Sequence, residues 1–173
     1  MTFRIRKTAD EEITQLGVIE RSADSAFTTI PGLEWVATAG VQSDTLHHRL
    51  LAEGYSAVAV DEHDIPVGFI NGDYVDDTLH ILGVAVTREY QGQGMGKLLM
   101  ADAIRCARER ALHAVTLTTF RTVPWNQPFY ERLGFDVIAQ ADLPAHLIRV
   151  LDDEAAHGFC RAARCAMRLK LRK

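Results

Sequence analysis

The sequence predicts a mixed α+β fold, with a central, mostly antiparallel sheet that contains one parallel pair of strands and is flanked by helices. Three β-rich runs within residues 56–86, joined by short polar turns, predict an antiparallel meander. A glycine-rich loop, an amphipathic helix over 95–112 and a β-prone run over 115–119 then predict a parallel crossover. With 173 residues, of which 47% are hydrophobic, the chain can bury one sizeable core. We therefore expect a single domain over 1–173.

The N-terminal part reads as a short strand followed by a helix. Residues 3–6 alternate apolar and basic side chains, which is typical of a strand. Thr8 and Glu11 have the spacing of a capping box, in which each end of the first turn satisfies a backbone N–H of the other. The apolar positions that follow at helical spacing predict an inward face made of Ile13, Leu16 and Ile19.

The segment 27–42 loses the helical period around Pro31-Gly32, so we expect an irregular stretch that could border a pocket. Ser43 has the properties of an N-cap for a second helix, and Gly54 would end that helix. On this helix, His47 and its neighbour His48 are expected on the solvated side.

The middle and C-terminal parts supply the remaining elements. Polar turns at 61–64 and 76–77 separate the strands of the meander. After the crossover, the sequence predicts a short helix, a strand, a helix and a last strand, which we place at 124–134, 135–138, 143–157 and 165–171.

Composition excludes several functional classes. A net charge of −4 disfavours general nucleic-acid binding, which relies on clustered Lys and Arg. No apolar run reaches the length of about 18 residues that a membrane span needs, and the charged N-terminus is unlike a signal peptide, so we expect a cytoplasmic protein. Cys106, Cys160 and Cys165 lack zinc or disulfide spacing. The histidines lack metal-binding spacing as well, and no metal is expected.

The loop Gln91–Gly96 lies between a predicted strand and a predicted helix, which is where exposed N–H groups and a helix N-terminus bind anions. A P-loop would need Ser or Thr after Lys97, but Leu98 stands there. A dinucleotide-binding loop would need glycine in place of Lys97. The loop could also be a turn that merely joins two elements.

A third pattern fits: Q/RxxGxG/A, matched at Gln91, Gly94 and Gly96. On this loop and the order of elements around it, the chain resembles the GCN5-related N-acetyltransferase (GNAT) superfamily. The resemblance implies that acetyl-CoA is the cosubstrate, that the loop binds its pyrophosphate and that the preceding strand pairs with its pantetheine arm. The cofactor-binding residues so implied are Gly83, Val84, Ala85, Val86, Gln91, Gly92, Gln93, Gly94, Met95, Gly96 and Lys97.

The block from Leu117 to Phe135 resembles the second motif of the same superfamily, in which an Asn and a Tyr border the thioester. The resemblance maps these roles onto Asn126, as a contact of the pantetheine arm, and Tyr130, as a group near the sulfur. A tyrosine hydroxyl could protonate the departing thiolate, so Tyr130 is the candidate acid. Two alternatives remain open: Asn126 could be a helix N-cap, and Tyr130 could be a packed aromatic.

The sequence differs from the superfamily's pattern at the position expected for the general base. Many relatives carry a glutamate in the strand before the loop, whereas the matching stretch here, 80–86, contains no acid. A histidine side chain can titrate near neutrality, so His80 is a candidate base or substrate contact, although it could equally be structural. Glu34 and Asp73 are further candidates for this role.

An acceptor cation would suit the irregular segment, where an aromatic wall accompanies a carboxylate. The candidate substrate-binding residues are Phe27, Glu34 and Trp35, together with His80; ordinary packing of the segment is the alternative. The expected function is transfer of an acetyl group from acetyl-CoA to a primary amine of a small molecule or peptide. A CoA-binding regulatory module without catalysis and a toxin-like acylation of charged tRNA are the competing functions, and a homodimer is left open.

Overall fold

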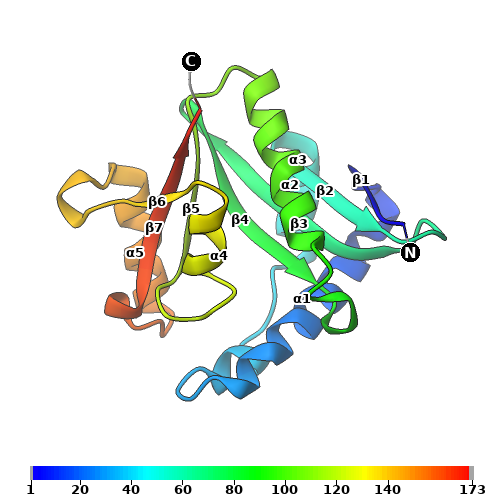
Figure 1. The fold of residues 1–173 in the computed structure, drawn as a ribbon, viewed down its shortest axis with the longest axis horizontal. Coiled ribbons are helices and arrows are strands. Elements are labelled where there is room, and N and C mark those ends of the chain that lie inside the picture. Colours follow the sequence, from blue (N-terminus) through cyan, green and yellow to red (C-terminus); the bar gives the residue numbers. More distant parts are fainter. Residues whose placement is uncertain (1, 172–173) are drawn as a thin grey trace. The chain divides into compact units, whose positions relative to one another are not determined.

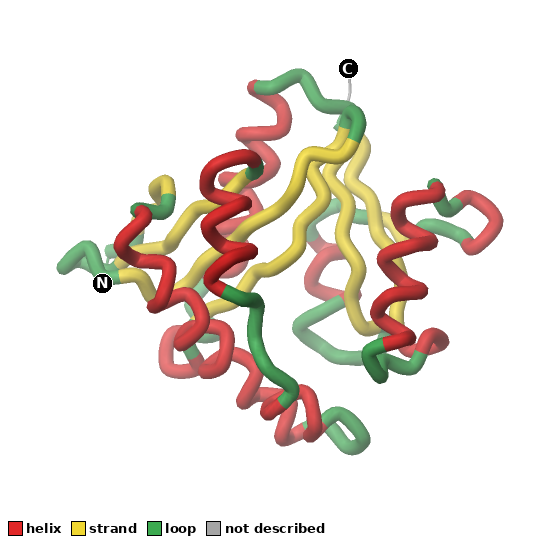
Figure 2. The backbone as a smooth tube through the Cα atoms, turned by 180° about the vertical axis from the view of Figure 1, so that it is seen from behind, coloured by secondary structure: helices red, strands yellow, loops and turns green. Residues whose placement is uncertain are grey.

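The computed structural model describes residues 2–171 and contains a seven-stranded sheet in the order β1-β2-β3-β4-β5-β7-β6 (Figure 1). The strands are β1 (Arg4–Lys7), β2 (Tyr55–Val60), β3 (Pro66–Val75), β4 (Thr78–Val86), β5 (Ala114–Phe120), β6 (Asp136–Val137) and β7 (Arg164–Lys170). The α-helices are α1 (Ile13–Asp24), α2 (Asp44–Glu53), α3 (Met95–Glu109), α4 (Gln127–Arg132) and α5 (Ala145–Ala156). Short 3₁₀ turns join them, and Figure 2 shows how helices, strands and loops alternate along the chain.

The residues group into two compact units, which are described separately. Among the described residues, unit 1 contains 2–74 and 81–106, and unit 2 contains 75–80 and 107–171. Strand β4 contributes to both units, because its first residues, Thr78–His80, belong to unit 2 and the remainder belongs to unit 1. The glycine-rich loop therefore lies in unit 1, and the second motif lies in unit 2.

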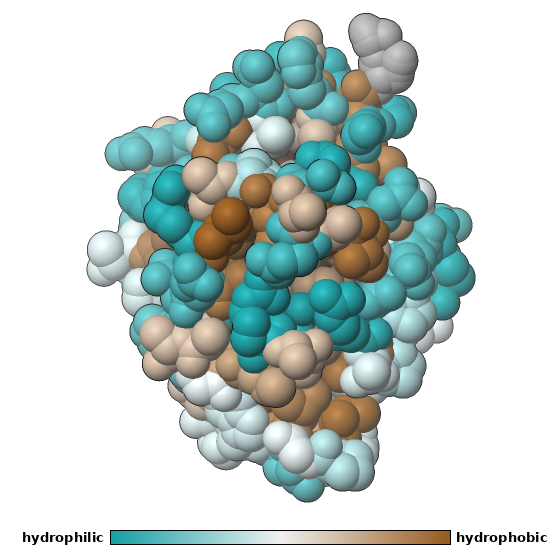
Figure 3. All heavy atoms as spheres, turned by 90° about the vertical axis from the view of Figure 1, so that its left-hand side faces the viewer, coloured by the Kyte–Doolittle hydropathy of each residue, from teal (hydrophilic) through white to brown (hydrophobic). Residues whose placement is uncertain are grey.

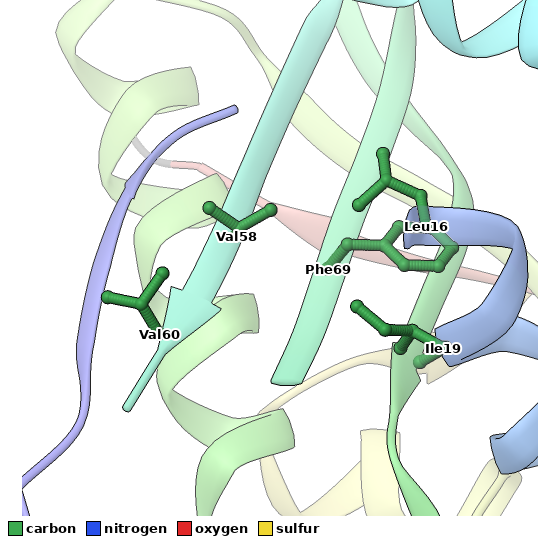
Figure 4. Close-up of a cluster of buried hydrophobic side chains, with 6 residues drawn as sticks. Leu16, Ile19, Val58, Val60 and Phe69 are labelled. Atoms are coloured by element: carbon green, nitrogen blue, oxygen red, sulfur yellow. The ribbon is translucent and has the colours of Figure 1, made fainter. Parts of the chain in front are cut away.

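In unit 1, α1 and α3 cover opposite faces of the sheet. Neighbouring residues of a strand point to opposite faces. Phe69 of β3 packs against Leu16 and Ile19 of α1 in a buried cluster (Figure 4). The preceding residue, Gly68, faces α3, because a Cβ at this position would lie 3.3 Å from Cδ1 of Leu99. The cluster is completed by Val58, Val60 and Ala85. The apolar face predicted for the first helix is thus confirmed.

In unit 2, β7 is the central strand, and α4 and α5 contact residues that point to its opposite faces. It pairs antiparallel with both β5 and β6. Ala166 joins Leu147 and Leu151 of α5 in one apolar cluster. The adjacent Cys165 instead contacts the Gln127 carboxamide of α4, with 3.6 Å between sulfur and oxygen. The predicted parallel pair is confirmed, because β4 pairs with β5 in parallel over Thr78–His80.

Two local predictions were wrong. The first helix is preceded by a 3₁₀ turn whose N-cap is Ala9, and Glu12 rather than Glu11 accepts the N–H of Ala9 at 2.9 Å. The Thr8 hydroxyl instead accepts a hydrogen bond from Ser56 of β2. His47 is also not solvated: it is 1% exposed and meets the Phe69 ring edge-on. Ser43 caps α2 as predicted, by accepting the N–H of Leu46.

The visible face in Figure 3 carries hydrophobic atoms in separate patches among hydrophilic ones. None of the helices between residues 2 and 171 combines the length and the apolar character that crossing a membrane requires.

Candidate active site

The second half of β4 offers a partly open stretch of strand. Leu82 is exposed, and Gly83 and Val84 are half-buried, whereas Ala85 and Val86 are buried. Because side chains alternate, Gly83 shares a face with Ala85, which packs in the α1 cluster. Of the four strand residues predicted to pair with the pantetheine arm, the two partly exposed ones, Gly83 and Val84, thus come first along β4.

The loop after β4 is held by hydrogen bonds at its start. The side-chain amide of Gln91 donates to the Val86 carbonyl at 3.0 Å, and the N–H of Gln91 donates to Arg88. Gly92 and Gly94 have φ of 81° and 83°, a region that L side chains rarely adopt, and a Cβ at either position would meet nothing within 4 Å. Both glycines are therefore required by the backbone conformation, and the space beside them is open.

The loop presents its backbone donors without internal acceptors. Within residues 2–171, the N–H groups from Gly92 to Lys97 donate to no backbone or side-chain acceptor, and the first bond of α3 runs from the Leu98 N–H to the Gly94 carbonyl. Met95 is buried at the helix start, while Gln93 and Lys97 are exposed. Successive free N–H groups at a helix N-terminus can bind an anion, which is the role that the sequence predicts for this loop.

A polar cluster beside Gly83 was not predicted from the sequence. The side chains of Gln42, which precedes α2, and Asn71, from β3, fill the place that a side chain at position 83 would take. The Asn71 amide donates to the Gln42 oxygen at 2.9 Å and contacts Nδ1 of His47 at 3.3 Å. The backbone N–H of Gln42 donates to the Glu20 carboxylate at 2.9 Å. A buried Asn inside an apolar strand was the available sequence signal.

Two carboxyl groups one turn apart on α1, Glu20 and Asp24, were also missed. Burial raises the pKa of both, and the charge of Glu20 contributes further at Asp24, whose pKa rises to about 7. Asp24 has no hydrogen bond or ion pair within the described residues. Unit 1 therefore holds a carboxyl group that titrates near neutrality.

The irregular segment forms two 3₁₀ turns, Ser25–Thr29 and Glu34–Thr38. Phe27 is buried, whereas Trp35 is 38% exposed and Glu34 is exposed. One Glu34 oxygen accepts the N–H of Gly32 at 2.8 Å. Of the three acceptor contacts predicted in this segment, Glu34 and Trp35 thus present surface to solvent, and Phe27 mainly packs.

In unit 2, Asn126 takes the backbone position of an N-cap for α4, but its side chain makes no capping bond. Its oxygen instead accepts the hydroxyl of Thr119 on β5 at 2.7 Å, and the N–H of Phe120 lies at 3.5 Å. Among residues 2–171, nothing accepts from its NH₂ group. The side chain is therefore oriented by β5 with its donors unused.

Tyr130 lies on α4 and is 8% exposed. Its ring meets Phe129 and Phe135 edge-on, with centroid distances of 5.0 and 5.9 Å. The hydroxyl has no hydrogen-bond partner in the described chain, yet it is not among the fully enclosed polar atoms. Burial raises the pKa of Tyr130 to about 12, and the positive charge of Arg164 opposes part of that rise. The phenol therefore stays protonated at neutral pH and can act as a donor.

His80 is 3% exposed, and its Nδ1 lies 2.8 Å from the Thr116 hydroxyl. Its ring stands edge-on to that of His146, with 5.9 Å between centroids. Burial lowers the pKa of His146, whose Nε2 is enclosed without a hydrogen-bond partner within residues 2–171. Asp73, another candidate base, forms a salt bridge with Arg49. Within residues 2–171, no group of His, Cys, Asp and Glu side chains is suited to a metal ion.

Among proteins of known function, the chain is similar to the L-2,4-diaminobutyric acid acetyltransferase of Streptomyces coelicolor. The two are 44% identical in an alignment of 68 residues, and the match covers 36% of this chain and 39% of that protein. The match thus spans about two fifths of the relative's length.

Solved structures share the fold at low identity. The PaiA N-acetyltransferase of Thermoplasma acidophilum, solved with coenzyme A, aligns with a TM-score of 0.74 at 17% identity, covering 99% of this chain and 100% of that one. The N-acetylglutamate synthase of Neisseria gonorrhoeae, solved with coenzyme A and N-acetyl-glutamate, aligns with a TM-score of 0.73 at 15% identity, covering 100% of this chain and 36% of that one.

The model of the acetyltransferase (GNAT) family matches residues 25–135, which include the irregular segment, the meander, the glycine-rich loop and the second motif. The predicted resemblance is confirmed, and the chain belongs to the GNAT family of acetyltransferases.

Proposed function

We propose that the protein transfers the acetyl group of acetyl-CoA to a primary amine of a small acceptor by direct attack on the thioester. The observation that carries this proposal is the run of unpaired N–H groups from Gly92 to Lys97, which follows the partly open stretch of β4. Such a run suits a pyrophosphate, and a strand suits the amide-containing pantetheine arm. Solved relatives that hold coenzyme A support the assignment.

The reaction must remove protons as well as move the acetyl group. An alkylammonium with a pKa near 10.4 is neutral in about one molecule in 2,500 at pH 7. The neutral amine attacks the carbonyl carbon, a C–N bond forms and the C–S bond breaks. Of the two protons that the ammonium loses, one leaves to solvent and the other balances the thiolate, so that coenzyme A departs as a thiol.

Each candidate residue has a distinct task in this proposal. Tyr130 is the acid that donates a proton to the departing sulfur, because a phenol is protonated at neutral pH and the Tyr130 hydroxyl has no hydrogen-bond partner within residues 2–171. The unused amide donors of Asn126 bind the pantetheine arm. His80 remains the proposed base, and Glu34, Trp35 and Phe27 contact the acceptor. The name of the Streptomyces relative supports an amino-acid acceptor with a side-chain amine.

A second function is favoured by one observation: the open stretch Leu82–Val84 contains no carboxylate. A chain that binds coenzyme A but lacks a base on this strand could serve as a regulatory module without turnover.

One experiment separates the two functions. The protein is incubated with acetyl-CoA and each of four amines: L-2,4-diaminobutyrate, L-lysine, spermidine and n-butylamine. Thiol release is followed, and mass spectrometry tests for a mass gain of one acetyl group on the amine. Amine-dependent thiol release with the acetylated product supports the transferase. Thermal stabilisation by acetyl-CoA without any product supports the regulatory module, and the absence of both contradicts each proposal.

A further inference from the structure

Gly83 is the point at which a polar cluster touches β4. A Cβ at position 83 would lie 3.0 and 3.1 Å from the amide nitrogen and oxygen of Gln42 and 3.2 Å from the oxygen of Asn71. These distances are shorter than ordinary contacts, so the absence of a side chain at Gly83 is what allows the two carboxamides to lie against the strand. The glutamate that many GNAT relatives carry on this strand is absent from residues 80–86. The carboxamide of Gln42, which precedes α2, lies against the strand at Gly83 instead.

The Gln42 side chain is held in a fixed orientation. Its amide and that of Asn71 donate to each other's oxygens, at 3.4 and 2.9 Å. Asn71 is fully buried and also contacts His47, itself 1% exposed. The backbone N–H of Gln42 is fixed by Glu20 of α1. Three elements of unit 1 thus orient one side chain, which lowers the conformational entropy that binding would cost.

Hydrogen-bonding capacity remains unused at Gln42. A carboxamide has two N–H donors and two acceptor lone pairs. Within the described residues, the Gln42 side chain uses one donor and one lone pair, both with Asn71. Gln42 is half-buried, whereas Asn71 is 0% exposed. The unused donor and the unused lone pair therefore belong to Gln42, the more exposed of the two residues.

The chain direction places this group near the reacting end of the cosubstrate. The phosphate-binding loop follows the C-terminal end of β4, so an arm that pairs with Gly83–Val86 runs back along the strand from the loop. Its thioester end then lies at Gly83, about 10 Å from Val86 at the usual rise of a strand. This step rests on the proposed function, because it assumes that acetyl-CoA occupies the loop.

We propose that Gln42 contacts the acceptor and orients it for attack: its side-chain oxygen accepts a hydrogen bond from the attacking amine beside Gly83. Asn71 and Glu20 are positioning residues, since they act by holding Gln42. A carboxamide does not take up a proton at neutral pH, so Gln42 aligns the amine and leaves proton removal to another group. Alignment of this kind changes the rate of amine attack without changing the affinity for acetyl-CoA.

The test compares Gln42→Leu, Gln42→Glu and a matched control, Gln15→Leu, which alters an exposed glutamine of α1. Each variant is assayed with acetyl-CoA and the amine of the panel that the wild type acetylates fastest. Gln42→Leu should lower kcat/KM for the amine by about 10- to 100-fold and leave the acetyl-CoA Kd within about twofold. Gln42→Glu keeps an acceptor oxygen, so it should recover at least part of the loss and add a new ionisation to the pH profile. The control should match the wild type.

Other outcomes overturn the inference. Wild-type kcat/KM in a folded Gln42→Leu protein, or an equal loss of acetyl-CoA affinity, would show that Gln42 does not orient the amine. If Gln42→Leu does not fold, Gly83→Ala decides instead, because the added methyl group displaces the Gln42 amide and should reproduce the kinetic loss; unchanged kinetics there also reject the role. A wild type that acetylates none of the four amines rejects the proposed function and this inference together, which differs from an active wild type with an active variant.

Discussion

The two motifs of this protein present their polar groups in different ways. In unit 1, the loop around Gly92 and Gly94 presents backbone N–H groups. Glycine is required at these two positions by their positive φ angles and not by close contact with a neighbouring side chain. In unit 2, Asn126 and Tyr130 present side chains whose orientations come from partners on other segments, such as Thr119 and Phe135. A backbone site depends on local conformation, whereas a side-chain site depends on tertiary packing.

The largest effect is expected from the side-chain site. Tyr130→Phe keeps the ring and its contacts with Phe129 and Phe135 but removes the proton donor, so kcat should fall by about 10²–10⁴-fold while the acetyl-CoA Kd and the melting temperature change little. Tyr55→Phe is the matched control, because it removes a hydroxyl that bonds Asp102 outside the site. A Tyr130→Phe enzyme with normal kcat would reduce Tyr130 to a packing residue.

The backbone site should fail in the opposite manner. Gly94→Val places a β-branched residue at a φ of 83°, so the loop must change conformation and acetyl-CoA should lose its stabilising effect. For the wild type this effect is about 2.7 kcal/mol at 100 times Kd. Gly40→Val introduces the same strain at a φ of 105° in open space elsewhere in unit 1. Equal loss of binding in both variants would mean that strain, and not the loop, causes the effect.

The two units should also respond to pH in opposite directions. The pKa of Asp24 is raised from an ordinary 3.8 to about 7. Between these two values the folded unit 1 keeps the proton that the unfolded chain has already lost. The free energy of unfolding of unit 1 therefore falls as pH rises from 4 to 7. The lowered pKa of His146 means that unfolded unit 2 binds the proton first, so its stability falls as pH drops below about 6.5.

Hydrogen exchange at pH 5.5 and 7.5 can measure both trends, provided that rates are corrected for intrinsic exchange. Between these two pH values the raised pKa of Asp24, after allowance for the partial exposure of its carboxyl group, should change the free energy of unfolding of unit 1 by about 1 kcal/mol. Asp24→Asn should remove the trend in unit 1 and leave unit 2 unchanged. Parallel trends in both units would contradict the assignment of these groups.

The smallest effect should come from the support of Asn126. Thr119→Val removes the hydroxyl that fixes the Asn126 oxygen, at a cost of about 1 kcal/mol, or about fivefold in kcat/KM. Thr119→Ser keeps the hydroxyl and should retain most of the activity. A Thr119→Val protein that matches the wild type would show that the orientation of Asn126 does not depend on β5.

The contrast between the motifs also explains what sequence reasoning could predict. The loop could be read from Gln91, Gly94 and Gly96 alone, because its conformation is encoded within one short segment. Residues Gln42 and Asn71 are 29 positions apart and meet only in the folded unit. His47 was assigned to the solvated side because the helical pattern of α2 does not reveal that Asn71 of β3 contacts the imidazole ring. The capping pair was misplaced by one residue because Thr8 finds a partner on β2.

The unpaired N–H groups of the loop have a further consequence. Amide protons do not ionise in the range where carboxyl and imidazole groups do, so a site built from them carries the same partial charges at pH 5 as at pH 9. Its affinity for a pyrophosphate should then follow the ionisation of the ligand alone. The number of backbone donors also does not depend on the side chains of the exposed Gln93 and Lys97, since neither side chain supplies those donors. A substitution at either position that keeps the loop conformation therefore leaves the backbone N–H groups in place.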